Sequence, residues 1–221
     1  MNKKFKLSFL IIALIDVGIL FYVEQYLKPG YWIKSAIKVT LFLGTIVVYS
    51  LLSGQKIKDT INLKKIKNAK KLYLLMAGAY AAIIIIFLLV RNSLNLSEIK
   101  TSLLTKENMT ENNFIYVFIY IIICNSFLEE SFFRGFVANL IDGKWGKIVS
   151  AVLFALYHIG IVSGWFNPIL LVLCIAGLAA VGLILQYIDS KYDSILPGWL
   201  IHGCANLAIN TIGTIIILGK Y

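Results

Sequence analysis

Glu129-Glu130-Ser131-Phe132-Phe133-Arg134 lies within an otherwise apolar stretch that runs from Phe114 to about Leu140. An ionised side chain at bilayer depth costs about 3 kcal/mol on insertion scales, so such residues usually face a bundle interior or a water-filled cavity. On an α-helix, Glu130 and Arg134 share a face, and we expect them to pair. Glu129 points about 100° away from Glu130. It is therefore left to face another part of the protein.

The composition is that of an integral membrane protein. The chain has 221 residues, of which 59% are hydrophobic and 14% charged, and its mean hydropathy is +0.83. Soluble domains have roughly a quarter of their residues charged. A spanning helix needs about 20 residues, so the length allows about seven spans and short loops. We therefore expect an all-α, polytopic transmembrane helix bundle.

Seven apolar runs are long enough to span a membrane, at about 7–27, 36–53, 72–90, 114–140, 147–163, 168–188 and 195–218. We expect an amino-terminal three-helix part over residues 1–113 and a set of catalytic helices over residues 114–221. The sequence contains no linker or repeat that would separate them. The two parts are therefore predicted to form one membrane domain.

The positive charge is concentrated between the apolar runs. The net charge is +10, and lysines cluster at the amino terminus and between Gly54 and Lys71. Such clusters mark cytoplasmic segments and attract anionic headgroups. We therefore predict a multi-pass protein of the cell membrane with a cytoplasmic amino terminus. Membrane lipid is an expected partner and nucleic acid is not, and the sequence leaves the oligomeric state open.

The two histidines of the chain, His158 and His202, both lie in apolar runs. Counted from the nearest predicted cytoplasmic turn, Glu129, the two histidines and Asn206 are 9 to 13 residues into their helices. At about 1.5 Å per residue, this places all four roughly 14 to 20 Å from the cytoplasmic edge. Unrelated polar residues would scatter in depth. We therefore predict that these four form a site within the membrane.

Such a set of side chains suits the hydrolysis of an amide bond. Glu129 can take a proton from water and return it to the leaving amine, and His202 with Asn206 can donate to the oxyanion. A metal centre is the alternative, because Glu129, His158 and His202 form a competent zinc ligand set with one open position. The sequence leaves both chemistries open.

Three motifs resemble those of the CAAX-protease and bacteriocin-processing family of intramembrane proteases, also called CPBP or Abi. They occur in the family's order on the fourth, fifth and seventh predicted helices, and they are Glu129-Glu130-x-x-x-Arg134, Phe154-x-x-x-His158 and His202-x-x-x-Asn206. The resemblance covers about residues 114–210. It implies a polytopic fold with an active site inside the membrane.

The resemblance also implies roles for the matching residues. Glu129 and His158 would activate water, and His202 and Asn206 would hold the oxyanion. The remaining motif residues, Glu130, Arg134 and Phe154, would support the site. Family members are described as metalloproteases, and a glutamate-dependent mechanism has been argued for some, so the resemblance leaves zinc as a candidate cofactor.

The predicted function is that of an intramembrane endopeptidase that acts on a membrane-associated or hydrophobic peptide or protein. The alternative is a non-catalytic membrane protein that confers bacteriocin self-immunity by binding. An ion or proton pathway would use the same buried acids and histidines. It is disfavoured because the polar residues share one level and do not form a chain across the bilayer.

Overall fold

The computed structural model describes residues 2–66, 69–105, 107–110 and 113–219. Within these ranges the chain is helical and contains no strand. Seven described helices are long and apolar enough to cross a membrane: Lys3–Leu27, Tyr31–Ser53, Ala69–Ser93, Phe114–Asn139, Lys144–Val162, Pro168–Tyr192 and Leu196–Ile217. The predicted all-α bundle of about seven spans is therefore confirmed.

The spanning helices are joined by short helices and contain irregular turns. The α-helices are α1 (Lys3–Tyr22), α2 (Tyr31–Ser53), α3 (Ile57–Thr60), α4 (Ala69–Val90), α5 (Leu96–Thr105), α6 (Phe114–Tyr120), α7 (Ser126–Glu130), α8 (Lys144–Val162), α9 (Pro168–Tyr192) and α10 (Leu196–Ile217). Wider π turns form η1 (Val23–Leu27), η3 (Ile121–Asn125) and η4 (Ser131–Phe136), and tighter 3₁₀ turns form η2 (Arg91–Ser93) and η5 (Val137–Asn139).

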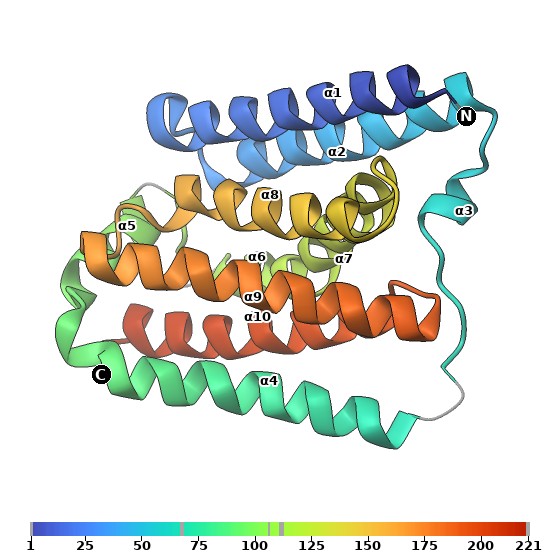
Figure 1. Cartoon of the computed structure of the whole chain (residues 1–221). Helices are drawn as coiled ribbons and strands as arrows, with labels where there is room; N and C mark the ends of the chain where they lie inside the picture. The colour runs from blue at the N-terminus through green and yellow to red at the C-terminus, as the bar shows by residue number, and fades with distance from the viewer. Residues whose placement is uncertain (1, 67–68, 106, 111–112, 220–221) are drawn as a thin grey trace.

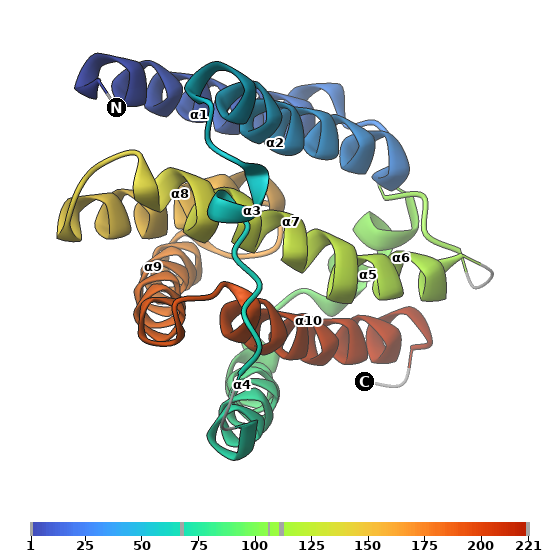
Figure 2. The same ribbon diagram turned by 90° about the vertical axis from the view of Figure 1, so that its right-hand side faces the viewer.

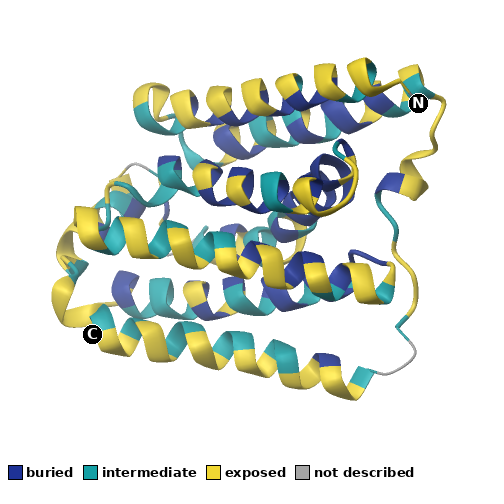
Figure 3. Ribbon diagram, in the orientation of Figure 1, coloured by how far each residue is buried: buried dark blue, intermediate teal, exposed yellow. Residues whose placement is uncertain are grey.

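The helices lie roughly side by side, with α1 and α2 at one edge of the bundle and α4 at the other (Figures 1 and 2). The α6–α7 helix and α8 lie between these edges, with α9 and α10 below them in both views. The most apolar 18 residues of α4 are 0% buried inside the protein. In Figure 3 this helix is largely exposed, whereas burial is concentrated around α7 and its neighbours. The apolar surface of α4 is therefore available to lipid.

An aromatic cluster joins the amino-terminal helices to the middle of the bundle. Phe42 of α2 stacks on Phe132 of η4 with ring centroids 3.8 Å apart and an interplanar angle of 4°. Phe133 packs edge-on against Phe42, and Phe9 of α1 packs edge-on against Phe136. Aromatic pairs in these arrangements stabilise a core by about 1 kcal/mol each beyond area burial. The predicted amino-terminal part is therefore packed directly against the segment that carries the acidic motif.

Two details of the fold differ from the prediction. The apolar pattern predicts that the second span starts near residue 36, but α2 begins at Tyr31. The helix can include Lys34 because this side chain is buried in ion pairs with Glu24 and Glu107 at 2.7 Å each. Between the predicted spans 72–90 and 114–140, where no helix was predicted, the chain forms the short helix α5, which buries Ile99 and Leu103. In both places the helix contains polar residues, so a hydropathy pattern does not predict it.

The segment that follows α2 crosses one end of the bundle. We call residues 54–66 the 54–66 strap, which includes α3 and passes over α7 in Figure 2. Its residue Asn62 donates to the carbonyl of Asp193 at 2.8 Å and accepts from the amide of Ile195 at 2.9 Å. The Thr60 carbonyl lies so close to Gly135 that a Cβ built there would be 2.5 Å from it. Only glycine therefore fits beneath the strap.

We predict that Gly135→Ala lowers the thermal stability of the protein, because the new methyl group meets a backbone carbonyl that cannot move without displacing the strap. Overpacking of this kind costs about 1–3 kcal/mol. Gly177→Ala in α9 is the matched control, since a Cβ there meets nothing within 4 Å. Thermal unfolding in detergent would measure both, and equal midpoints for the two variants would contradict the close approach.

Candidate active site

The predicted catalytic residues come from three helices, and the side chains of three of these residues converge. Glu129 lies in α7, His158 in α8 and His202 in α10. The carboxylate oxygen Glu129 Oε2 is 3.9 Å from His158 Nε2 and 3.8 Å from His202 Nε2. Glu129 is 1% exposed. The structure thus brings the carboxylate and both imidazoles to one buried point.

The helix that carries Glu129 is irregular on both sides of it. The π turns η3 and η4 flank the single regular turn of α7. Such turns occur frequently at functional sites. Two carbonyls of η3 also accept hydrogen bonds from side chains of α10: Trp199 Nε1 donates to the Ile123 carbonyl at 3.0 Å, and Asn206 Nδ2 donates to the Ile121 carbonyl at 3.3 Å. These bonds bring α10, with His202, against the acidic motif.

The two oxygens of Glu129 have different surroundings. Oε1 accepts from Asn125 Nδ2 at 2.8 Å and from Tyr157 Oη at 3.3 Å, and Lys38 Nζ lies 3.4 Å away. Oε2 is buried and has no hydrogen-bond partner among the described residues. One oxygen is therefore held in place, and the other is presented to the two imidazoles.

The Nδ1 nitrogen of each imidazole, which points away from Glu129 Oε2, forms a hydrogen bond. His158 Nδ1 is 2.7 Å from the Phe154 carbonyl, and His202 Nδ1 is 2.8 Å from Glu130 Oε1. Both partners are acceptors, so each Nδ1 carries the hydrogen, and a neutral ring then has a lone pair at Nε2. Both Nε2 atoms face Glu129 Oε2, which is also an acceptor. The centre therefore gathers three lone-pair-bearing atoms around one point.

The Glu130–Arg134 pair predicted from the i, i+4 spacing is confirmed. Arg134 Nη1 lies 3.3 Å from Glu130 Oε1, and both side chains are 0% exposed. The guanidinium carbon lies 4.0 Å from the centroid of the Phe154 ring, and Phe154 packs 4.5 Å from the His158 ring. Because Glu130 Oε1 also accepts from His202, this pair fixes one of the two converging imidazoles.

Asn206 is the one predicted catalytic residue whose contacts lie elsewhere. Its side-chain amide is bonded to the Ile121 carbonyl, as described above, and it is 9% exposed. It lies one helical turn beyond His202, as predicted. Its assignment to the oxyanion stays a prediction.

Lys38 and Tyr157 are residues of the site that the sequence motifs do not indicate. Lys38 Nζ donates to Asn125 Oδ1 at 2.8 Å and lies 5.0 Å from the centroid of the Tyr157 ring. A lysine inside an apolar run requires a partner, and that signal was available from the sequence. Tyr157 lies beside His158 within the second motif, where an aromatic residue gives no separate signal.

The three converging donors lie farther apart than the ligands of a tetrahedral zinc ion. Tetrahedral zinc with bonds of about 2.0–2.1 Å holds its ligand atoms roughly 3.3 Å apart. The two separations from Glu129 Oε2 are 3.9 and 3.8 Å. Within the described residues, no group of three or more His, Cys, Asp or Glu side chains is arranged so that it could hold a metal ion. The donors as placed do not fit zinc, and zinc binding stays a prediction that metal analysis of the purified protein would decide.

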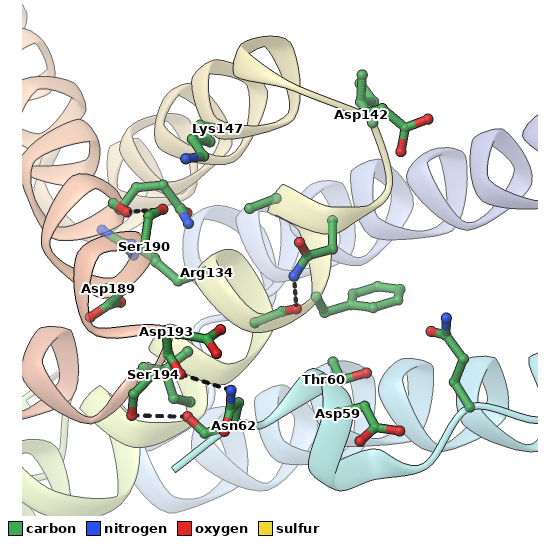
Figure 4. A pocket seen from close by; sticks show the side chains of 18 of the residues that line it. Asp59, Thr60, Asn62, Arg134, Asp142, Lys147, Asp189, Ser190, Asp193 and Ser194 are labelled. Atoms are coloured by element: carbon green, nitrogen blue, oxygen red, sulfur yellow. Dashed lines mark hydrogen bonds between the residues drawn. The ribbon is translucent and has the colours of Figure 1, made fainter. Parts of the chain in front are cut away.

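A polar cavity of about 540 Å³ opens beside the site, between the 54–66 strap, η4 and the end of α9 (Figure 4). Its described lining includes Arg134 and Asp189 but none of the three converging side chains. At its rim, the hydrogen bond from Lys6 at 2.8 Å holds the pKa of the Asp142 carboxyl below its usual range. The cavity therefore reaches the buried arginine that supports Glu130.

One family model matches part of the chain. Residues 111–208 match the family model described as Type II CAAX prenyl endopeptidase Rce1-like. This segment contains all three motifs, so the resemblance inferred from them is confirmed there. No curated protein and no solved structure gave a significant match. At the family level, the match supports an intramembrane protease of the CAAX type.

We predict that Arg134→Met destabilises the protein by about 3–5 kcal/mol, because it leaves the Glu130 carboxylate buried without its cation. The double variant Glu130→Gln with Arg134→Met removes both charges and is expected to recover much of the lost stability. Thermal unfolding of the two single variants and the double variant would measure this coupling. A double variant as unstable as Arg134→Met alone would show that charge pairing is not what the arginine provides.

Proposed function

We propose that this protein is an intramembrane endopeptidase of the CAAX-protease type that hydrolyses a peptide bond of a membrane-associated or hydrophobic peptide. The observation that carries the proposal is the convergence of Glu129 Oε2 with His158 Nε2 and His202 Nε2 at 3.9 and 3.8 Å. The family match over residues 111–208 supports the same reaction class.

The first step is the activation of water. Three acceptors around one point favour a molecule that donates, and water donates two hydrogen bonds. Glu129 Oε2 takes one proton as general base while His158 Nε2 accepts the other hydrogen bond. Asn125 and Tyr157 hold Oε1, so the carboxylate need not rotate. The water oxygen then attacks the carbonyl carbon of the scissile peptide bond.

The second step is the collapse of the tetrahedral intermediate. The proton that Glu129 takes from water can pass to His202 Nε2 and back, and while it is on that nitrogen His202 donates a hydrogen bond to the oxyanion, because Glu130 accepts from Nδ1 and holds the ring as that charge forms. The carbon–nitrogen bond breaks, and Glu129 returns the proton to the leaving nitrogen. The products are a new carboxyl terminus and a new amino terminus.

The proposed substrate class follows from the surroundings of the site. The helices that carry the converging residues are long and apolar enough to span a membrane, so a substrate must enter or lie against the bilayer. We propose that the lysine-rich amino terminus and the 54–66 strap face the cytoplasm, since basic segments concentrate on that side.

The experiment compares peptides from membranes and medium of a deletion strain complemented with wild type, Glu129→Gln or Glu98→Gln. Glu129→Gln keeps the shape of the side chain but lacks the base, so we expect fragment yields to fall by about 100-fold or more. Glu98→Gln changes an exposed carboxylate in α5 and is expected to match wild type.

The contradictory result is a set of peptides that does not differ between wild type and Glu129→Gln at equal expression. If both forms also restore a phenotype of the deletion strain, the protein acts without catalysis. That outcome favours self-immunity by binding over proteolysis.

A further inference from the structure

Lys38 occupies a position that the family match does not cover. It lies in α2, far outside the matched residues 111–208, yet its ammonium group donates to Asn125 and lies 3.4 Å from Glu129 Oε1. Its side chain is 12% exposed. A buried lysine in a spanning helix requires a partner, and here the partner is the proposed general base.

Two contacts on α2 fix the position of Lys38. One turn before it, Lys34 forms ion pairs with Glu24 and Glu107 at 2.7 Å each. One turn after it, Phe42 stacks on Phe132, only a few residues from Glu129. α2 is thus anchored on both sides of Lys38. The packing of the helix therefore holds the lysine against the Glu129 carboxylate.

The charges around the site form two pairs. Arg134 lies against Glu130, and Lys38 lies against Glu129. With both pairs ionised their four charges cancel, and neither imidazole has to carry a second proton. Burying an uncompensated charge is costly. Without Lys38, a proton on Glu129 or on a histidine would have to replace its charge, and that proton would occupy one of the three lone pairs that face the centre.

We infer that Lys38 is a positioning residue of the hydrolytic site, which pairs with Glu129 and holds Oε1 so that Oε2 faces the two histidines. The inference rests on the proposed function. By this inference, the amino-terminal part of the chain contributes a residue to the site that the carboxy-terminal helices form.

The first test is spectroscopic and needs no substrate. Infrared spectra of the purified protein would compare wild type, Lys38→Met, Lys38→Arg and the double variant Lys38→Met with Glu129→Gln. We expect a carboxylic-acid C=O band, or a protonated-imidazole band, that appears in Lys38→Met and is absent from wild type and from Lys38→Arg. Loss of the new acid band in the double variant would assign it to Glu129. Identical spectra for wild type and Lys38→Met would overturn the inference.

The second test is kinetic and uses the peptide that wild type cleaves and Glu129→Gln does not. For Lys38→Met we expect kcat to fall by about 100-fold, as for an impaired general base, with KM within about threefold. Lys38→Arg keeps the charge and is expected to retain activity within about tenfold of wild type. Thr40→Val is the control on the same helix, because Thr40 is exposed and its hydroxyl donates to the Ala36 carbonyl of α2, and it is expected to leave kcat unchanged.

The outcomes separate the two proposals. If wild type cleaves no better than Glu129→Gln, the proposed function fails, whatever the lysine variants do. If wild type cleaves and Lys38→Met keeps its kcat, the function stands and the role of Lys38 fails. Should Lys38→Met not fold, the inference still requires that Lys38→Gln lose kcat and that Lys38→Arg retain it.

Discussion

The buried carboxylate of Glu129 sets the requirements that the surrounding structure meets. An ionised group at this depth must be compensated, and the chain supplies a lysine from α2, an amide and a tyrosine hydroxyl to one oxygen. The other oxygen is left facing two imidazoles whose outer nitrogens are already bonded. The result is a carboxylate that is stabilised through one oxygen and available through the other. This asymmetry is what a general base in a membrane interior needs.

Close approach of the helices makes that arrangement possible. Side chains of α10 donate to two carbonyls of η3, and Gly203 beside His202 allows α10 to lie against the Ile122 carbonyl, where a Cβ would be only 3.0 Å away. On the opposite side, stacked aromatic rings hold α2 against η4. The irregular α6–α7 helix therefore packs between the regular helices α10 and α2. The exposed helix α4 packs on the outer side of α10 and presents its apolar surface to lipid.

Much of this could be predicted from the sequence, because the signals lie along single helices. Hydropathy gives the seven spans, and the four-residue spacing gives the Glu130–Arg134 pair. Counting residues from the polar turns places Glu129, His158 and His202 at one level, and the structure brings them together. Contacts between helices are harder to foresee, because they depend on rotation and packing. Lys38 has no spacing relation to Glu129, the π turns have no distinct sequence signal, and the bond from Asn206 to the Ile121 carbonyl joins residues of two different helices.

We propose that water activated by Glu129 cleaves a peptide bond within the membrane. The most direct measurement is cleavage in water enriched in oxygen-18 by purified protein in lipid nanodiscs, followed by mass spectrometry of the products. We expect wild type to place one oxygen-18 atom in each new carboxyl terminus and Glu129→Gln to form no such product above background. Labelled product formed equally by both proteins would contradict this proposal.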